Sequence, residues 1–199
     1  RDTATAAAGL EQAIPATVGA AHALLRAPVR DLAARVDGRV PLPEALARFA
    51  DSLDVVTYES ENVPLSAAEF LAERVKVMPS IAALRVSQDR LNEKLQFAEL
   101  GIPTAPYAEV NSFDELQDAA PRIGYPSVLK TRRMGYDGKG QFVLRREDEL
   151  QMAWDRLHST GLILEGLVPF DRELSIIAVR GRTRETLFYP LVAGLATDY

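Results

Sequence analysis

One stretch of the sequence, SVLKTRRMGYDGKGQFVLRR at residues 127–146, constrains the fold more than any other. Two runs with apolar and β-branched side chains, residues 127–132 and 141–146, flank a loop that contains Gly135, Gly138 and Gly140. Two such runs with glycine between them are typical of strands joined by a tight turn. The sequence therefore predicts a β-hairpin here.

The same hairpin is a positive island in an acidic chain. Six Lys or Arg residues lie between positions 130 and 146, where Asp137 is the one acid, whereas the rest of the chain has 17 bases and 27 acids. Glycine amides that point together can bind an anion, so a phosphate-binding loop fits both properties. The Walker and dinucleotide-binding motifs do not occur. A solvated turn explains a loop of Gly, Asp and Lys just as simply.

Lys130 favours the phosphate interpretation. In the alternating pattern of SVLKTR it shares a strand face with Val128 and Arg132, so a cation projects from an otherwise apolar strand beside the loop. Burying an unpaired charge is costly, so an anionic partner is expected. That partner is either a nucleotide phosphate or a carboxylate in a structural salt bridge.

Two acidic residues mark strand ends further along the chain. Glu165 opens the segment EGLV, residues 165–168, at the end of one predicted strand, and Glu173 begins the next strand. A strand end is expected to offer free backbone amides and carbonyls that can bind the edge of adenine, and a carboxylate can accept both ribose hydroxyls. The alternative is that both residues are exposed strand-end charges.

From residue 43 onward the pattern predicts alternating helices and strands. Ser112 and Glu115 have capping-box spacing, in which each side chain accepts the other residue's backbone amide. We expect residues 102–191 to form an α+β unit with one largely antiparallel sheet, which residues 173–180 and 186–191 complete. Helices are expected at residues 43–51, 65–76, 81–100, 112–122 and 147–158, and strands at 54–58 (buried), 127–132, 141–146, 162–165, 173–180 and 186–191.

The composition limits the function classes. A net charge of -5 and a pI near 5.2 argue against general binding to nucleic acid or a membrane surface. The absence of cysteine excludes disulfides, zinc–thiolate sites and thiol catalysis. No apolar run approaches the ~20 residues needed to span a bilayer, and no signal-peptide pattern opens the sequence, so we expect a cytoplasmic location. The first residue is Arg1, which suggests a chain that is cut, processed or incompletely recorded.

Several segments together resemble the 5-(carboxyamino)imidazole ribonucleotide synthetases, a family of ATP-grasp ligases of purine biosynthesis. The resemblance covers about residues 43–192, and KTRRMGYDGKGQ is its most specific part. The matching segments are residues 88–107, 123–145 and 162–180, together with VVTYESENVP at 55–64, where Ser60 replaces the usual phenylalanine.

The resemblance implies an α+β or α/β architecture in two parts. Residues 43–101 would be a partial pre-ATP-grasp domain with connecting helices, and residues 102–192 would be the ATP-grasp lid subdomain. Residues 1–42 and 193–199 have no assignment.

The resemblance also implies the residues of the site. Lys130, Asp137 and Lys139 would be catalytic, and Tyr136 and Asp137 would lie near the ribonucleotide substrate. The ATP-binding group would comprise residues for phosphate (Arg90, Lys130), a closing loop (Gly135, Tyr136, Asp137, Gly138, Lys139, Gly140, Gln141), adenine (Glu165, Gly166, Leu167, Val168) and ribose (Glu173).

The implied reaction is the ATP-dependent carboxylation of 5-aminoimidazole ribonucleotide. ATP would phosphorylate bicarbonate, and the carboxyl group of the resulting carboxyphosphate would pass to the substrate amine, with release of ADP and phosphate. The cofactors would be ATP and Mg²⁺, with the metal ligands in a downstream domain and none in this chain. The full-length protein would form a homodimer.

The sequence departs from the family in three respects. Residues 1–42 lack the glycine-rich turn that binds substrate phosphate, Ala196 stands near the position of a nucleotide-binding histidine, and the downstream domain is absent. A truncated or frameshifted gene, a recombinant fragment or an incomplete record would each explain this. Two other functions stay open: a catalytically silent nucleotide-binding fragment, and another ATP-grasp enzyme such as a biotin carboxylase or a formate-using glycinamide ribonucleotide transformylase.

Overall fold

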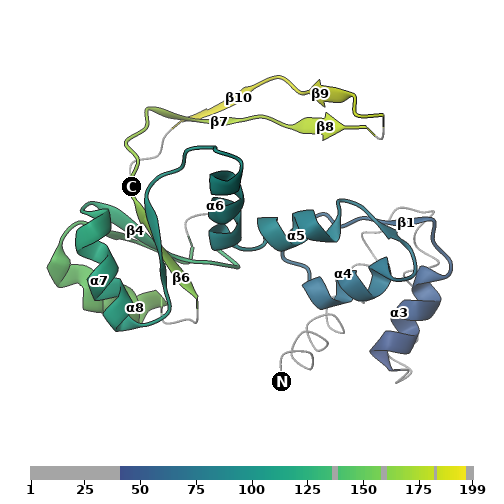
Figure 1. The fold of residues 1–199 in the computed structure, drawn as a ribbon, viewed down its shortest axis with the longest axis horizontal. Coiled ribbons are helices and arrows are strands. Elements are labelled where there is room, and N and C mark those ends of the chain that lie inside the picture. Colours follow the sequence, from purple (N-terminus) through teal and green to yellow (C-terminus); the bar gives the residue numbers. More distant parts are fainter. Residues whose placement is uncertain (1–40, 136–138, 158–160, 182, 196–199) are drawn as a thin grey trace. The chain divides into compact units, whose positions relative to one another are not determined.

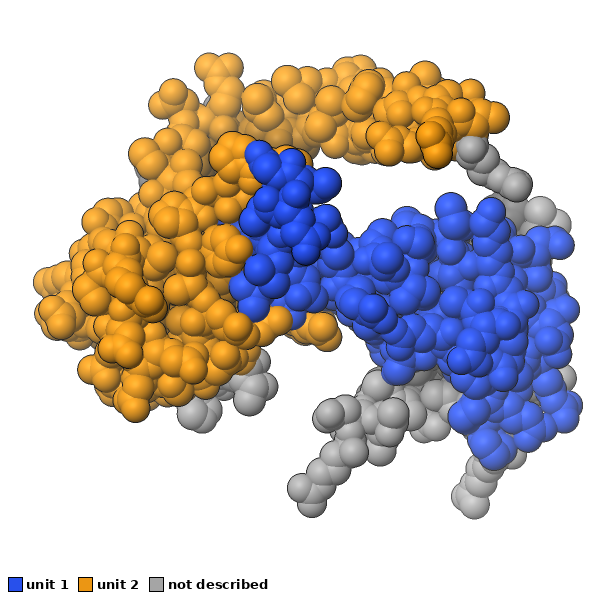
Figure 2. Space-filling view, in the orientation of Figure 1, with its two compact units in different colours: residues 1–101 blue, residues 102–199 orange. Residues whose placement is uncertain are grey.

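The chain divides into two compact units, residues 1–101 and 102–199 (Figure 2). The computed structural model describes residues 41–135, 139–157, 161–181 and 183–195. Within those ranges no helix is both long enough and apolar enough to cross a membrane. The unassigned segment 1–42 lies almost wholly outside the described residues, as does most of the tail at 193–199.

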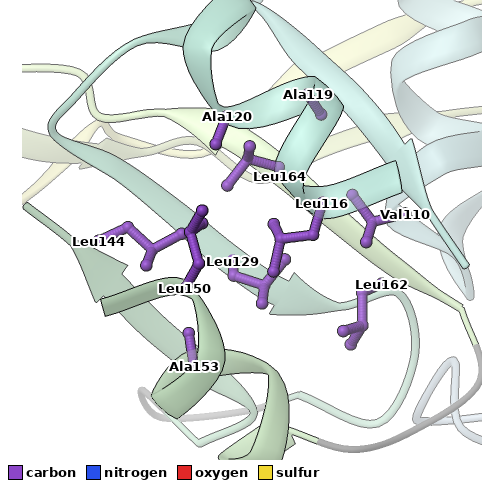
Figure 3. Packing of buried hydrophobic residues seen from close by; sticks show 10 residues of the cluster. All are labelled: Val110, Leu116, Ala119, Ala120, Leu129, Leu144, Leu150, Ala153, Leu162 and Leu164. Carbon is purple, nitrogen blue, oxygen red and sulfur yellow. The ribbon is translucent and has the colours of Figure 1, made fainter. Parts of the chain in front are cut away.

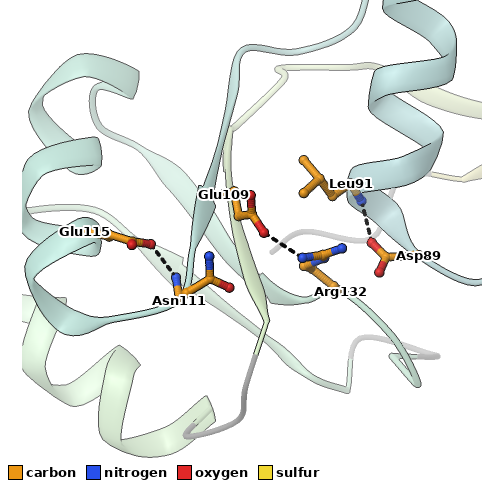
Figure 4. Close-up of polar contacts among 6 residues, drawn as sticks. All are labelled: Asp89, Leu91, Glu109, Asn111, Glu115 and Arg132. Carbon is orange, nitrogen blue, oxygen red and sulfur yellow. Dashed lines mark hydrogen bonds and ion pairs between the residues drawn. The ribbon is translucent and has the colours of Figure 1, made fainter.

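The described part of the first unit is mostly helical. Asp89 separates the last two helices, because its carboxylate caps the second one by accepting the Leu91 amide at 3.0 Å (Figure 4). The single long helix or helix pair expected at 81–100 is therefore a pair. The elements are α3 (Leu42–Ala50), β1 (Val55–Val56), α4 (Leu65–Ala72), β2 (Lys76–Val77), α5 (Ile81–Ser87) and α6 (Arg90–Glu99).

Two expectations for this unit are wrong. The strand expected to be buried at 54–58 shrinks to β1, where Val55 is 52% exposed, because β1 pairs only with β2 in the described residues and has no sheet around it. The helix expected over 65–76 ends at Ala72. Val75 and Val77 are both buried two positions apart, which is the period of a strand rather than a helix.

The second unit is built on a four-stranded antiparallel sheet with the order β3-β6-β4-β5. The predicted hairpin is its β4–β5 pair, in which Lys130 lies opposite Gln141. Helices α7 and α8 pack against the sheet (Figure 1). The elements are β3 (Tyr107–Val110), α7 (Phe113–Ile123), β4 (Ser127–Thr131), β5 (Gln141–Leu144), a 3₁₀ turn (Glu147–Glu149), α8 (Leu150–Leu157) and β6 (Leu162–Gly166).

The core lies between the sheet and these two helices (Figure 3). Leu129, Leu144 and Leu164 come from three neighbouring strands and are fully buried against Leu116 of α7 and Leu150 of α8. Full burial of one such leucine contributes about 1.5–3 kcal/mol. Since side chains alternate along a strand, residues next to these leucines must face the opposite side of the sheet.

One of the two hydrogen bonds predicted for the capping box is present. Ser112 Oγ accepts the amide of Glu115 at 3.2 Å, as predicted. The Glu115 carboxylate accepts the amide of Asn111 at 2.7 Å, rather than that of Ser112 (Figure 4). The predicted bond from the Ser112 amide to Glu115 is therefore wrong, and the amide one residue earlier takes its place. The reason is that the chain leaves β3 with the Asn111 amide directed at the first turn of α7.

The expectation that residues 173–180 and 186–191 complete the four-stranded sheet is wrong. In the described residues they form separate two-stranded ladders, β7–β10 and β8–β9, which we call the ribbon (Figure 1). Their sequence is apolar on both faces, as in strands covered on two sides. The strands are β7 (Arg172–Ser175), β8 (Ala178–Arg180), β9 (Thr186–Phe188) and β10 (Val192–Leu195).

The ribbon exposes much apolar surface. Nine of its large apolar side chains are each at least half exposed: Leu174, Ile176, Ile177, Val179, Leu187, Phe188, Tyr189, Leu191 and Val192. Such exposed apolar side chains, which we call the apolar patch of the ribbon, favour association with other chains.

We therefore expect the purified chain to self-associate through the ribbon as its concentration rises. The double variant Val179→Glu/Leu187→Lys replaces a directly opposed cross-strand pair by opposite charges, so the β8–β9 pairing is kept while the patch is broken. Sedimentation velocity should show a smaller associated fraction for this variant. The control is Met152→Lys on α8, a residue that is 61% exposed outside the ribbon. Equal association of all three proteins would contradict the prediction.

Candidate active site

A cavity of about 220 Å³ lies on the sheet face opposite α7 and α8. It is formed by the centre of the sheet, the segment after β6 and the start of β7. Its lining combines a small apolar surface with three charged groups, one cationic and two anionic. The lining residues are Val128, Lys130, Gln141, Val143, Glu165, Gly166, Leu167, Val168, Phe170 and Glu173.

Strand alternation explains why these side chains meet. On β4, Leu129 enters the core, so Val128 and Lys130 must face the cavity. Directly opposed residues of antiparallel strands share a face, and Glu165 of β6 lies opposite Val128, whereas Gln141 of β5 lies opposite Lys130. The same pattern that buries the leucines therefore gathers the polar groups.

Lys130 and Glu165 form an ion pair within the cavity. Nζ of Lys130 donates to Oε2 of Glu165 at 3.1 Å, and the two side chains are 24% and 10% exposed. They are diagonal neighbours on adjacent strands, a separation that long side chains can bridge. Of the two partners that the sequence left open for Lys130, this structure therefore contains the carboxylate.

A second ion pair lies on the same sheet face. Nη1 of Arg132 donates to Oε1 of Glu109 on β3 at 2.7 Å (Figure 4). Arg146 pairs similarly with Asp148 at 2.8 Å at the surface, where such a pair adds little stability. The positive island is thus neutralised in part by acids from outside the hairpin, which limits its long-range attraction for anions.

Two backbone amides at the end of β6 already donate hydrogen bonds to other parts of the chain. The amide of Gly166 donates to the Pro106 carbonyl at 2.9 Å, and that of Leu167 donates to the Pro126 carbonyl at 3.2 Å. These bonds leave the Val168 amide as the donor in segment 166–168 that is best suited to read a base edge. The expectation of several free amides here is wrong for Gly166 and Leu167, because the flanking chains extend the sheet past β6.

The base of the glycine loop is closed by Gly140. The Thr131 amide donates to the Gly140 carbonyl at 2.8 Å, and Gly140 has a φ of +71°. A Cβ atom at this position would lie 2.6 Å from Thr131 Oγ1. Both the backbone angle and the close approach therefore require glycine.

The structure brings together seven of the fourteen residues that the sequence assigned to ATP: Lys130, Gln141, Glu165, Gly166, Leu167, Val168 and Glu173. Gly135, Lys139 and Gly140 belong to the loop and do not line the cavity, and Arg90 lies in the first unit. The remaining three, Tyr136, Asp137 and Gly138, lie outside the described residues.

Sequence reasoning assigned the apolar residues Leu167 and Val168 to the site but not Val128, Val143 and Phe170. Val128 and Val143 oppose each other across β4 and β5, and their alternation with Leu129 and Leu144 could have identified them. Phe170 follows a proline in a segment without periodicity, so no local signal marks it.

Metal binding finds no support in the described residues. They contain no group of three or more His, Cys, Asp or Glu side chains arranged to hold an ion. Glu165 and Glu173 both line the cavity, but Glu165 is engaged with Lys130.

Comparison with known families assigns this architecture to a class. Residues 95–198 match the sequence model of the ATP-grasp domain, and residues 6–88 match that of the ribonucleotide synthetase preATP-grasp domain. The chain therefore belongs to the ATP-grasp family. The second match includes most of segment 1–42, in which the sequence alone gave no motif.

Within that family the chain is similar to N5-carboxyaminoimidazole ribonucleotide synthases, which confirms the resemblance seen in the sequence. It is 51% identical over 149 residues to the enzyme of Pseudomonas aeruginosa, covering 75% of this chain and 41% of the relative. Identity to the enzyme of Brucella melitensis is 46% over 158 residues, covering 78% and 44%. The chain thus spans about two fifths of the length of these relatives.

Solved structures give the same result. The synthetase of Thermus thermophilus matches with a TM-score of 0.68 and 51% identity, over 75% of this chain and 40% of that one. The Aspergillus clavatus synthase in complex with ADP and 5-aminoimidazole ribonucleotide matches with a TM-score of 0.69 and 31% identity, over 83% and 45%.

Replacement of Gly140 tests whether the loop base needs glycine. Gly140→Ala should destabilise the chain by about 1–3 kcal/mol, because it adds backbone strain and a clash with Thr131 Oγ1. Gly101→Ala is the matched control, since its φ of +69° is nearly the same but no atom lies within 4 Å of the added Cβ. Urea denaturation measures both. In a Thr131→Ala background, Gly140→Ala should lower the free energy of unfolding by no more than Gly101→Ala does. If the loss is as large as in the unaltered background, the clash with Thr131 does not contribute.

Proposed function

We propose that this chain carries the ATP-binding unit of a ligase that carboxylates 5-aminoimidazole ribonucleotide in purine biosynthesis. ATP would activate bicarbonate as carboxyphosphate, and the products would be N5-carboxyaminoimidazole ribonucleotide, ADP and phosphate. The observation that carries the proposal is a cavity that gathers Lys130, Gln141, residues 165–168 and Glu173 beside the motif KTRRMGYDGKGQ. Similarity to relatives named for this activity supports it.

The cavity suits the nucleoside part of ATP. Val128, Val143 and Phe170 offer apolar contact for the faces of adenine, and the Val168 amide can donate to a ring nitrogen. Glu173 is an exposed carboxylate at the start of the ribbon and can accept the ribose hydroxyls. These contacts orient the nucleotide without any covalent step by the protein.

The phosphates are assigned to Lys130 and the glycine loop. Their cationic and amide groups would offset the charge that develops on the transferred phosphoryl group, and exclusion of water would protect carboxyphosphate from hydrolysis. Within this assignment Lys130, Asp137 and Lys139 are the catalytic residues, Tyr136 and Asp137 approach the ribonucleotide, and Arg90 contributes to the phosphates.

Magnesium would accompany ATP and shield its phosphates. Because the described residues gather no metal-ligand set, its protein ligands are assigned to polypeptide beyond those residues. The chain covers only 41% and 44% of these relatives, so the complete reaction is proposed for a protein of their length. A cytoplasmic location and a homodimer belong to the same proposal.

Nucleotide binding is the first test. Titration calorimetry should detect ADP binding to the chain, and Lys130→Ala should weaken it about tenfold or more through loss of a charge-assisted contact. Lys76→Ala is the control, since this exposed lysine of β2 has the same charge and lies in the other unit. Absence of ADP binding by the unaltered chain would refute the proposal.

Turnover is the second test. Phosphate release from ATP that requires both bicarbonate and 5-aminoimidazole ribonucleotide would assign the full reaction to this chain. Binding without such release would assign it nucleotide binding alone, the silent function that the sequence left open. Release stimulated by a different acceptor would favour another ATP-grasp enzyme.

A further inference from the structure

An ion pair, which we call the strap, lies across the end of the four-stranded sheet where β4 leads into the glycine loop. Nη1 of Arg132 donates to Oε1 of Glu109 at 2.7 Å (Figure 4). In the strand order β3-β6-β4-β5, strand β6 separates β3 from β4, so the strap connects two strands that are not neighbours. Neither residue of the strap lines the cavity, and neither belongs to the nucleotide site assigned above.

The path of the Arg132 side chain depends on Gly161, the residue before β6. The Arg132 amide donates to the Gly161 carbonyl at 3.0 Å, and a Cβ atom on Gly161 would lie only 3.4 Å from Arg132 Cδ. Gly161 has a φ of +83°, a backbone conformation that favours glycine. A glycine at this position therefore leaves room for the arginine to extend past β6 toward Glu109.

The strap also lies beside a buried apolar residue. Ile163 of β6 is directly opposite both Glu109 and Lys130, and it has no exposed surface. Directly opposed residues share a face of the sheet, so Ile163 lies on the cavity side, away from helices α7 and α8. The aliphatic stem of an arginine can cover such a residue. A purely structural role for the strap must therefore be separated from a role in ligand binding.

We propose that Arg132 is a positioning residue that fixes the start of the glycine loop for the binding of phosphate. Arg132 directly follows β4, and its amide and its guanidinium group hold it to Gly161 and to Glu109 at once. The hydrogen bond from the Thr131 amide to the Gly140 carbonyl holds the other end of the loop. The loop thus leaves the sheet between two fixed points. The inference rests on the proposed nucleotide site, and it adds two residues that act through the loop rather than by contact with the nucleotide.

Fixed loop ends favour the binding of phosphate. Several amides of the loop must point together to bind one anion. A strand end with few side-chain contacts opens at low free energy, and a ligand that has to order an open loop binds less tightly. Because the strap restricts the residue from which the loop starts, less ordering remains for the ligand to bring about.

The register of the sheet predicts which part of the nucleotide is affected. Thr131 at the end of β4 lies opposite Leu162, whereas Ser127 at its start lies opposite Gly166. Val168, which is assigned to adenine, therefore lies beyond the end of β4 that is opposite the strap. We expect loss of the strap to weaken the binding of the phosphates and to leave the binding of the base nearly unchanged.

The negative charge of Glu109 distinguishes positioning from other roles of Arg132. Removal of a carboxylate makes this face of the sheet more positive, which by electrostatics alone would strengthen the binding of an anion. Release of Arg132 for direct contact with phosphate would strengthen it too. Positioning predicts the reverse, because Glu109→Gln frees the start of the loop.

The experiment measures the dissociation constants of adenosine and ADP by titration calorimetry. The constant for adenosine divided by that for ADP reports the contribution of the phosphates. Glu109→Gln should lower this ratio about threefold, as expected for one partly exposed ion pair. Arg132→Met should lower it at least as much, although it keeps an unbranched stem beside Gly161. In the Arg132→Met background, Glu109→Gln should change the ratio by less than about 1.5-fold.

Arg146→Met is the matched control. It removes one cation from the same hairpin, and Arg146 pairs with Asp148 at the surface rather than across the sheet. Its ratio should stay within about 1.5-fold of that of the unaltered chain. An unchanged or raised ratio in Glu109→Gln would overturn the proposal, because a purely structural strap would weaken adenosine and ADP equally. Additive effects of Glu109→Gln and Arg132→Met would overturn it as well.

Amide hydrogen exchange tests the strap without any nucleotide. The Arg132 amide should exchange about threefold faster in Glu109→Gln, because its hydrogen bond to the Gly161 carbonyl then opens more often. The Leu129 amide, in the middle of the same strand, should exchange at an unchanged rate. Equal exchange of the Arg132 amide in both proteins would refute the strap as an anchor. Failure of the unaltered chain to bind ADP would instead refute the proposed function, and the exchange rates would still decide whether Glu109 holds Arg132.

Discussion

The second unit depends on one constraint: strand β4 must be apolar on one face and can be charged on the other only where the charges are paired. Leu129 fills the core under α7 and α8, and its neighbour Lys130 is turned to the cavity by the geometry of the strand. The cost of placing an ammonium group there is offset by Glu165 of the adjacent strand. Fold and site therefore share one strand, and a shift of its register by one residue would destroy both.

Pairing also changes how the positive hairpin can act. A cluster of six unpaired cations would attract any anion from a distance, whereas Lys130 pairs with Glu165 on the adjacent strand and Arg132 pairs with Glu109 on β3. Discrimination must then come from short-range geometry. In the proposed site, the amides of the glycine loop and the N–H donors of Lys130 would provide such geometry, because they would bind only a ligand that reaches them.

The parts of the fold that could be predicted are those determined by local pattern. The β4–β5 hairpin and helix α7 with its Ser112 cap follow from alternation, capping chemistry and turn residues. The grouping of Lys130 with Glu165 and Glu173 was implied by the family resemblance instead. What failed depends on distant partners. The use of the Gly166 amide by Pro106 and the exposure of Val55 are set by chain segments whose proximity no local pattern contains.

The separate position of the ribbon bears on the site. Lys130 and Glu165 belong to a sheet with its own leucine core, whereas Glu173 lies on a two-stranded ladder whose apolar side chains are largely exposed. Segments with few buried contacts open at lower free energy than packed sheets. The end of the cavity assigned to phosphate is thus held by the stable element, and the end assigned to ribose by the less stable one. In the proposed nucleotide site, a polypeptide that covers the ribbon would hold Glu173 more firmly and so favour binding, without contacting the nucleotide itself.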